Sequence, residues 1–449
     1  MEINVADKTL LQVRELLAHN DVEAAIRIIE ALLPPDQADV FGELPPEQQE
    51  ALLPRLETED AADILEELED EDAAQLADRI DPDVLAPIVD EMAPDEAADL
   101  LGDLRPSLST ATLAHMQKAD EVRPLLLHPD ETAGGLMTSE YPAFRETMRA
   151  GQALNAVREW QPKGIESAYL FIVDEQDRLV GIVSLFQVLR AEPSEALSSL
   201  MAPEVLKVRA SDDQETAARL MARYDLVAVP VVDDNERLVG VITVDDLVDV
   251  LEEETTEDFH RIAGSGPLER PYLDTSIASV AWKRVGWLLL LFVTGTLTGT
   301  VMRLFQDLLS QMVVLAVFVP LLIGTGGNAG SQTTAIIIRA LAVGDIALTD
   351  SLRVLWREVR SALILAAVLA PIAYVRAVTW GNSPTTGIVV AGGIFAIILW
   401  ADSVGSLLPL LAAKLHIDPA LVSGPLMSTL VDATGLLIYF SIARLAFGV

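Results

Sequence analysis

Oxygen-bearing side chains that could bind cations lie in stretches of this sequence that are otherwise apolar. The stretch 320–337, PLLIGTGGNAGSQTTAII, places Asn328 and Gln332 among four glycines. Asp402 and Asp432 are the only acids near the centres of apolar segments, where an ionisable group indicates function. The chain has no cysteine, and these segments hold no histidine. Such oxygen donors favour Mg²⁺, Ca²⁺ or Mn²⁺ over Zn²⁺ or Cu²⁺.

The glycine-rich stretch has three explanations. A phosphate-binding loop is excluded, because the G-x-x-x-x-G-K-[ST] pattern is absent and no lysine lies between Lys283 and Lys414. A seam for close helix packing explains the glycines but not Asn328 and Gln332. We therefore expect Pro320 and the glycines to break a helix and free carbonyls along a water-filled path.

Asp432 has hydroxyl neighbours at helical spacing. Ser428 lies one turn before it, so the two would share a helix face. A proton carrier and a structural acid bonded to hydroxyls are alternatives for Asp432 and for Asp402, and the role of Asp402 stays open.

The chain consists of two parts of opposite charge. Residues 276–449 hold 7 of the 68 acidic and 10 of the 31 basic residues, a net charge of +3, whereas residues 1–275 carry −40. A strongly acidic part repels nucleic acid and attracts metal cations, although solubility alone is the simpler explanation. Without cysteine, disulfides and thiolate metal sites are excluded. The first residues lack the basic and apolar regions of a cleavable signal peptide.

Five apolar segments predict five transmembrane helices, each about long enough for a ~30 Å hydrocarbon core. Pro371 and Arg376 interrupt the third segment and make it short. Basic residues precede the first segment and separate the second from the third, which places the N-terminal part in the cytoplasm and the C-terminus outside an inner membrane. The segments are 285–302, 312–338, 361–375, 388–413 and 420–446.

A unit of about 12 residues recurs between residues 34 and 104. Each copy opens with proline or an acid followed by an acid, which starts a helix. Leu, Ile and Ala recur at helical spacing, which excludes a disordered acidic segment. The pattern predicts an α-solenoid-like stack of short helices. The openings are 35–36, 46–47, 59–60, 71–72, 82–83 and 94–95.

A second repeat matches 169–189 to 228–248 with a shift of 59 residues. Each copy predicts a strand, an acidic turn, a second strand and a helix. This α/β pattern resembles a tandem pair of cystathionine-β-synthase-type (CBS) regulatory modules, which implies a pseudo-two-fold disc that often binds adenine nucleotides such as ATP and usually dimerises.

The family's ribose contact matches Gly240, Thr243 and Asp246 in the second copy. In the first copy Gln187 replaces the aspartate, which speaks against a nucleotide there.

The order of these parts is similar to the MgtE family of bacterial magnesium transporters. The stretches PLLIGTGGNAGSQ (320–332) and SGPLMSTLVDATGLLIY (423–439) resemble the two pore signatures of that family. We expect a multi-domain membrane protein with a helical superhelix domain (1–132), a CBS pair (133–250), an acidic connecting helix (251–280) and a five-helix transmembrane pore domain (281–449).

The resemblance implies a homodimer with a pore between subunits, in which Asp432 holds Mg²⁺ through its water shell. Family members often carry Asn where this chain has Gly424, so a side-chain ligand is absent there and selectivity among Mg²⁺, Co²⁺, Mn²⁺ and Ca²⁺ stays open. The implied pore residues are Asp432, Ser428, Gly424, Pro320, Gly324 and Asn328.

The resemblance also implies that Mg²⁺ bridges acids of the cytosolic part and thereby closes the pore, a negative feedback by the transported ion. The matching positions are Asp63, Asp95, Asp99, Glu215, Asp225, Asp246, Asp249, Glu254, Glu257 and Asp258.

Two other functions stay open: a proton-coupled divalent cation carrier, and a membrane-anchored nucleotide or Mg²⁺ sensor without conduction. An enzyme is not expected, because two lone acids are the only candidate groups at membrane depth.

Overall fold

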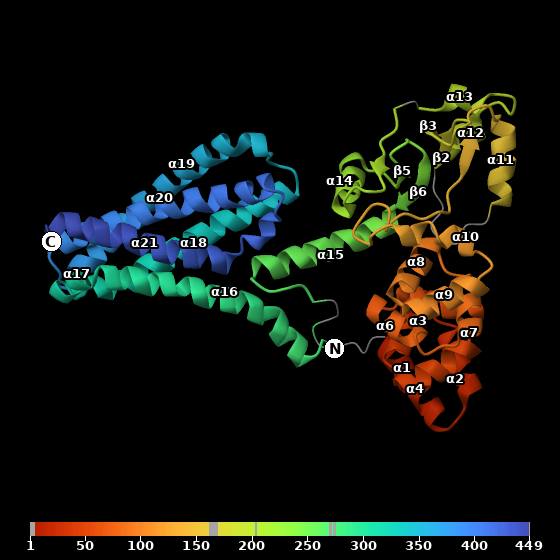
Figure 1. Ribbon diagram of the computed structural model, residues 1–449, viewed down its shortest axis with the longest axis horizontal. Helices are drawn as coiled ribbons and strands as arrows, with labels where there is room; N and C mark the ends of the chain where they lie inside the picture. Colours follow the sequence, from red (N-terminus) through yellow and green to blue (C-terminus); the bar gives the residue numbers. More distant parts are fainter. Residues whose placement is uncertain (1–4, 161–168, 203, 269–271, 273–274, 449) are drawn as a thin grey trace. The chain divides into compact units, whose positions relative to one another are not determined.

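The computed structural model describes residues 5–160, 169–202, 204–268, 272 and 275–448. The chain divides into two compact units, one up to Glu252 and one from Glu253. The first unit holds a stack of short helices followed by two small sheets, and the second holds long apolar helices (Figure 1). This confirms the predicted fold class.

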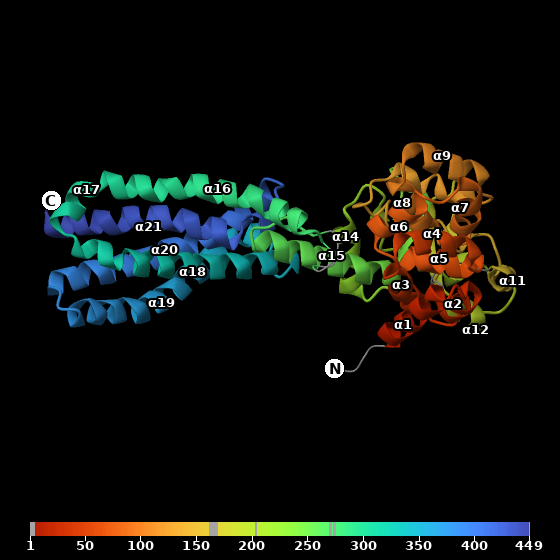
Figure 2. The ribbon, with the colours of Figure 1, turned by 90° about the horizontal axis from the view of Figure 1, so that it is seen from below.

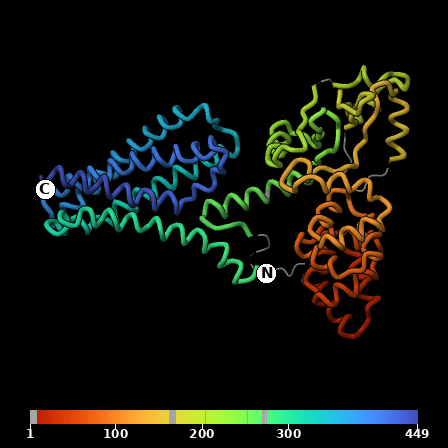
Figure 3. Tube along the Cα trace, in the orientation of Figure 1, coloured from red at the N-terminus to blue at the C-terminus, as the bar shows by residue number. Residues whose placement is uncertain are grey.

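The helices of the stack begin where prolines and acids predict. Five of them, α3, α4, α7, α8 and α9, have proline in the first turn, where its missing N–H removes no helical bond. α5 and α6 begin with acids instead, which complement the unpaired N–H groups. All six predicted openings lie in the first turn of a helix. Figure 3 shows the stack as successive short helical turns in the N-terminal part of the chain. The helices are α1 (Val5–Ala18), α2 (Val22–Ile29), α3 (Pro34–Gly42), α4 (Pro46–Leu52), η1 (Leu53–Arg55), α5 (Thr58–Glu67), α6 (Asp70–Ala77), α7 (Pro82–Val89), α8 (Pro94–Asp103), α9 (Pro106–His115), α10 (Ala119–Val122) and η2 (Leu125–Leu127).

Carboxylates at helix ends connect each of several helices to the third helix after it. The accepting acid and the donating backbone N–H are 27 residues apart every time, because the acid lies at the end of one helix and the N–H group at the start of the third helix after it. Unpaired N–H groups at a packed helix start need such acceptors. Part of the acidic surplus is therefore structural. The bonds join Ala93 N to Glu66 (2.6 Å), Gln117 N to Asp90 (2.8 Å), Glu57 N to Glu30 (3.1 Å) and Arg105 N to Asp78 (3.4 Å).

Two three-stranded sheets follow, with the same topology in each copy of the second repeat. The middle strand pairs parallel with the first and antiparallel with the third. The strands are β1 (Ala143–Arg145), β2 (Tyr169–Val173) and β3 (Leu179–Ser184), then β4 (Val208–Arg209), β5 (Ala228–Val232) and β6 (Leu238–Thr243). The helices around them are α11 (Ala150–Glu159), α12 (Leu185–Arg190), α13 (Leu197–Leu200) and α14 (Gln214–Tyr224).

The two copies exchange their opening segments. Thr138, in the opening of the first copy, bridges to Val241 on β6 of the second copy, and Ala202 bridges to Ile182 on β3 of the first. Met137 lies so close to Gly240 that a Cβ there would be 2.4 Å from its sulfur, and Met201 approaches Gly181 in the same way, at 2.6 Å. Each glycine therefore makes room for the methionine of the other copy.

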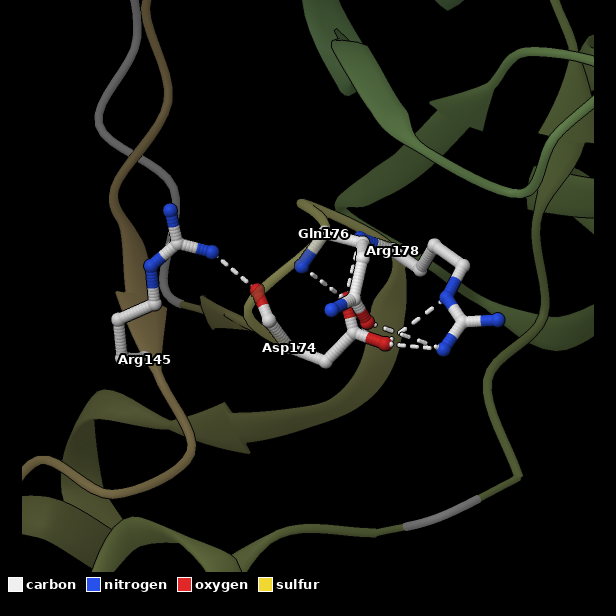
Figure 4. Close-up of polar contacts among 4 residues, drawn as sticks. All are labelled: Arg145, Asp174, Gln176 and Arg178. Carbon is white, nitrogen blue, oxygen red and sulfur yellow. Dashed lines mark hydrogen bonds and ion pairs between the residues drawn. The ribbon is translucent and has the colours of Figure 1, made fainter.

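A carboxylate organises the acidic turn of each copy. In the first copy, Asp174 Oδ1 accepts bonds from the backbone N–H groups of Gln176 (2.9 Å) and Arg178 (3.0 Å), and Arg145 donates to the Asp174 carbonyl (Figure 4). Desolvation acts to raise the pKa of Asp174, but the bonds from Arg178 lower it below its ordinary value. Asp233 repeats this arrangement in the second copy. Asp174 and Asp233 therefore stabilise turns of the fold.

The acidic connecting helix, α15, runs from Val244 to Ile262. The predicted range 251–280 includes the end of α15, Gly264 with a φ of +75° that follows it, and the start of α16 (Ile277–Leu304). Residues 269–271 and 273–274 of the predicted range lie outside the described residues.

Among the described residues, five helices of the second unit are long and apolar enough to cross a membrane, as predicted; Figure 2 shows them as long ribbons. Side chains of α18, α19, α20 and α21, including Phe318, Ile397 and Tyr439, form a core. α16 lies along α21 and has no buried residue. The elements are α16 (Ile277–Leu304), α17 (Gln306–Gln311), α18 (Val314–Ala342), η3 (Leu348–Asp350), α19 (Ser351–Thr379), α20 (Pro384–Lys414), η4 (Pro419–Leu421) and α21 (Gly424–Phe447).

The third span corrects the sequence prediction. Pro371 and Arg376 do not interrupt it, and α19 continues through both over 29 residues. A proline removes one backbone bond, and neighbouring helices tolerate that loss inside a membrane helix.

Candidate functional site

The glycine-rich stretch lies in an unbroken helix. α18 continues from Val314 to Ala342 with Pro320 inside it. The prediction that Pro320 and the glycines break the span is therefore wrong. Pro320 removes only its own bond to the carbonyl of Ala316, and the packed neighbours hold the remaining turns. Since most backbone groups of this stretch stay bonded within the helix, its side chains must carry the polar chemistry.

Three of the four glycines form a packing seam. A Cβ at Gly326 would lie 2.4 Å from Ile397 Cγ2 on α20, and one at Gly330 would lie 2.8 Å from Met427 Cε on α21. A Cβ at Gly327 would lie 2.5 Å from Ser428 Oγ. The explanation by helix packing thus holds for these glycines.

The opposite face of α18 is polar and exposed. Gly324, Asn328 and Gln332 follow one another at four-residue spacing, with Pro320 one turn before them, and all four are exposed. Neither amide forms a hydrogen bond with another residue in the described ranges. Because unpaired amides are unfavourable in hydrocarbon, this face requires water or a second polar surface.

Asp432 is half-buried in the middle of α21, which lies side by side with α18. No hydrogen bond or ion pair connects its carboxylate to any other residue that the structure describes. The two quoted motifs meet, since Ser331 Oγ donates to the Gly424 carbonyl at 2.9 Å and Ser428 packs on Gly327. A half-buried acid in a long apolar helix, without a partner in the described ranges, is the arrangement that a cation would complete.

Acids of the helical stack and of α15 meet within the first unit. Asp95 on α8 has a buried Oδ1 with no hydrogen-bond partner. Desolvation and the nearby Asp245 raise the pKa of Asp95 from 3.8 to about 6. Desolvation, Asp95 and Asp245 raise the pKa of Asp246 from 3.8 to about 7. These carboxylates repel one another, and a cation between them would remove the repulsion.

The same contact extends to α5. Desolvation, with Asp63 and Asp95 nearby, raises the pKa of Glu66 to about 7, even though Glu66 accepts the Ala93 N–H bond. Desolvation and then Asp249 on α15 raise the pKa of Glu67. Desolvation, followed by Asp130 and Asp70, raises the pKa of Asp99. Thus Asp63, Asp95, Asp99, Asp246 and Asp249 from the predicted set lie near other acids in this contact.

Glu215 and Asp225 lie at the two ends of α14. Glu215 is in the first turn of α14 and forms an ion pair with Arg219 at 2.6 Å, whereas Asp225 caps the other end of α14 with a φ of 52°. The structure therefore does not bring these two predicted residues together.

The last turns of α15 hold the other three predicted acids. Arg261 forms ion pairs with Glu257 and with Asp418 in the turn before α21. Desolvation, then Asp418 and Glu254, raise the pKa of Asp258. The end of α15 also reaches the start of α21, since a Cβ at Gly264 would lie 3.4 Å from Pro425 Cγ.

Whether this acid contact suits a cation depends on the oxygen atoms that it offers as ligands. Within the described ranges no three acidic or histidine side chains converge as a preformed metal site. The donors present are carboxylates, and Asp95 has a buried oxygen without a partner, which suits a hard cation that keeps part of its water shell. The regulatory set stays a prediction.

Sequence reasoning missed several members of these contacts. Glu66, Asp130 and Asp245 are single acids among many, and no spacing marks them. A signal did exist for Arg261 and Asp418. Arg261 is a lone arginine after a run of acids, and Asp418 is the only acid between the last two spans.

Comparison with known proteins identifies the family. The family described as a divalent cation transporter matches residues 319–442, the MgtE intracellular N domain matches 12–64 and 32–131, and the CBS domain matches 133–194 and 197–253. The magnesium transporter MgtE of Thermus thermophilus is 42% identical over 325 residues, which cover 72% of each chain. This chain belongs to the MgtE family.

Two further relatives agree with this. The magnesium transporter MgtE of Bacillus subtilis is 35% identical over 322 residues, covering 72% of this chain and 71% of that one. A crystal structure of the cytosolic domain of the Mg²⁺ channel MgtE in complex with ATP has a TM-score of 0.51 and 35% identity, and it covers 54% of this chain and 99% of that chain. The predicted resemblance to the MgtE family is confirmed.

The residues predicted for a nucleotide have local roles in this MgtE-family chain. Asp246 Oδ2 accepts bonds from the backbone N–H and the hydroxyl of Thr243, both at 3.0 Å, at the start of α15. Gln187 does the same in the first copy, where it accepts the Ser184 N–H at 2.9 Å. Gly240 leaves room for the side chain of Met137. Helix capping and packing thus account for the motif without a nucleotide.

Asp402 lies away from the polar face of α18. It is 1% exposed on α20, its Oδ1 has no hydrogen-bond partner, and Thr333 and Glu358 lie nearby. Because Thr333 is on the buried side of α18, Asp402 does not share a surface with Asn328 and Gln332.

The packing seam gives a testable pair of substitutions. Gly326→Ala should lower stability by ~1–3 kcal/mol, because its Cβ would overlap Ile397. Gly324→Ala is the control, since nothing lies within 4 Å of its Cβ position. Heating each purified variant in detergent and measuring the monodisperse fraction checks this. Equal stability of the two variants would contradict the assignment of Gly326 to a packing seam.

The acid contact of the first unit predicts a pH dependence. The pKa values of Asp95, Glu66 and Asp246 are raised, so their contribution to stability is fully present below about pH 4 and is lost as pH rises through 6–7. In EDTA, hydrogen-exchange protection of α8 should fall from pH 5.5 to 8, after correction for intrinsic rates. A loss of ~1–2 kcal/mol is a roughly 5–30-fold drop.

Mg²⁺ should restore the protection of α8 at pH 8 and change it little at pH 5.5, where protons already relieve the repulsion. Protection of α2, which carries none of these acids, is the internal control. Protection of α8 that is independent of pH in EDTA would contradict this account.

Proposed function

We propose that this chain mediates Mg²⁺ uptake as a channel that cytosolic Mg²⁺ closes. The half-buried carboxylate of Asp432, which has no partner in the described part of the chain, carries the proposal. Magnesium transport by the named relatives supports it. Membership of a transporter family favours transport over catalysis.

The oxygen chemistry of the path suits a hydrated ion. Mg²⁺ dehydrates reluctantly, so a carboxylate and amides would bind it mainly through its waters. Asp432 offsets the unfavourable transfer of a cation to membrane depth, while Asn328 and Ser428 offer further oxygens. Gly424 offers only its carbonyl, which already accepts from Ser331.

A homodimer completes the proposal. The exposed polar face of α18 is unfavourable against lipid, and a second copy facing it would enclose a water-filled path with two Asp432 carboxylates. The paired CBS modules give a second contact, as their resemblance implies. In the inner membrane, the basic residues before α16 and between α18 and α19 orient the N-terminal domains to the cytoplasm and the C-terminus outside.

The driving force explains why closure is needed. A membrane potential of ~100 mV contributes ~2.3 kcal/mol per charge, so ~4.6 kcal/mol for a divalent ion. That energy corresponds to a roughly 2,000-fold accumulation at equilibrium. An open channel would therefore overload the cell, and the ion itself is the natural signal for closing.

Closure would use the acid contact of the first unit. Mg²⁺ between Asp95, Asp246 and their neighbours would hold the start of α15 against the helical stack. A switch from 1:99 to 99:1 needs ~5.5 kcal/mol of differential binding, which several sites of ~1–2 kcal/mol supply together. The end of α15, joined through Arg261 to Asp418 beside α21, is the element that would act on the path.

ATP binding is less well supported than Mg²⁺ binding in this chain. A related cytosolic domain was crystallised with ATP. Here Asp246 is engaged with Thr243, and Gln187 replaces the aspartate in the first copy, so a nucleotide would have to displace a helix cap.

A proton-coupled carrier is the second candidate, favoured by the buried Asp402 with its unpaired oxygen. It differs from a channel in its driving force. A carrier requires a pH gradient, whereas a channel follows the membrane potential.

Ion flux in proteoliposomes tests the proposal. We expect Asp432→Ala to abolish Mg²⁺ uptake driven by potential, because the carboxylate that offsets the ion's charge is removed. Asp402→Asn is the matched control, and it should leave this uptake unchanged. Gel filtration of both variants confirms that they fold.

Uptake that survives Asp432→Ala would exclude the path proposed here and favour a sensor without conduction. Uptake that requires a pH gradient and is lost in Asp402→Asn would favour the carrier.

A further inference from the structure

The first ten residues of α19 extend beyond what a membrane span requires. α19 has 29 residues and is therefore ~43 Å long, against a hydrocarbon core of ~30 Å. The part 361–379, which is apolar except for Arg376 near its end, alone fills that core. If it does so, Arg360 lies at the boundary and Arg357 and Arg353 lie ~5–10 Å further out, at the depth of lipid headgroups.

These arginines share one exposed face of the helix. Arg353, Arg357 and Arg360 follow at spacings of four and three residues, and all are exposed. Trp356, 61% exposed, lies among them on the same face. An exposed tryptophan between arginines is typical of the membrane interface, where the ring meets acyl chains and headgroups at once.

Within the described residues, the protein neutralises little of this charge. Arg353 pairs with Asp350 at 3.1 Å, and Arg360 Nε donates to the Trp356 carbonyl at 3.3 Å. Arg357 forms no ion pair in the described part of the chain. Glu358, the acid between them, is half-buried and lies near Asp402 on α20 instead.

The same face continues as an apolar stripe. Ile364, Val368 and Ile372 follow the arginines at four-residue spacing, and each is more than half exposed. α19 packs mainly on α20 and lies at the edge of the bundle in both views (Figure 1; Figure 2). The arginines would lie at the depth of a lipid headgroup, and the apolar stripe would lie at the depth of its acyl chains. One phospholipid could therefore contact both.

We propose that the face formed by Arg353, Trp356, Arg357 and Arg360 binds the headgroup of an anionic phospholipid of the cytoplasmic leaflet, with its acyl chains along Ile364, Val368 and Ile372. The proposal rests on α19 crossing the bilayer and does not depend on which ion is conducted. A second copy is a poorer occupant, because a two-fold contact would place these arginines against their own copies. Guanidinium groups also bind phosphate in a bidentate manner.

The test compares lipids and single arginines in the full-length protein. Native mass spectrometry would measure bound phosphatidylglycerol against phosphatidylcholine. We expect preferential retention of phosphatidylglycerol, and an affinity loss of about fivefold for Arg357→Gln, the equivalent of ~1 kcal/mol per basic residue. Arg303→Gln, an exposed arginine at the end of α16, is the matched control and should leave the preference unchanged.

Equal retention of the two lipids, or the same loss in both variants, would overturn the proposal. Inorganic phosphate that displaces phosphatidylglycerol at equal concentration would assign the face to free phosphate instead. A change in dimer content or in the Mg²⁺ protection of the cytosolic part in Arg357→Gln, without a change in lipid preference, would assign it to a protein contact.

Discussion

Repulsion among carboxylates is the constraint on which the account depends. α5, α8 and the start of α15 bring Asp63, Asp95, Asp246 and Asp249 into one desolvated contact, which raises the pKa values of Asp95 and Asp246. A buried oxygen of Asp95 stays without a partner. The contact is therefore unfavourable by itself at neutral pH, and any bound cation shifts the balance. A sensor for a divalent ion needs this kind of marginal arrangement.

α15 relates that contact to the membrane part through one continuous helix. Its first residues belong to the acid contact, and its last turn holds the Arg261–Asp418 ion pair beside the start of α21. In the proposed mechanism, ion binding at the first residues of α15 would therefore act on the same helix that carries Arg261. In the proposed path, the carboxylate of Asp432, which has no partner among the described residues, would make transfer of a cation less unfavourable.

The architecture was predictable because its signals are local. Proline and acid openings, the 59-residue repeat and the five apolar segments each predict their elements without tertiary information. The glycine-rich stretch was harder. Glycines suggested a broken helix, but Gly326, Gly327 and Gly330 face neighbouring helices and allow them to approach, and only the facing side chains decide between the two explanations. For the same reason the roles of Glu66 and Asp90 as caps 27 residues away could not be predicted from their own neighbourhood.

In the proposed mechanism, Mg²⁺ at the acid contact closes the path. The most direct measurement is Mg²⁺ efflux from proteoliposomes as the concentration on the cytosolic side is varied, for the wild type and for Asp95→Asn with Asp246→Asn. The account predicts that neutral side chains raise the Mg²⁺ concentration needed for half-closure, because the bridging charges are removed, while the maximal flux stays the same. An unchanged half-closing concentration would contradict it.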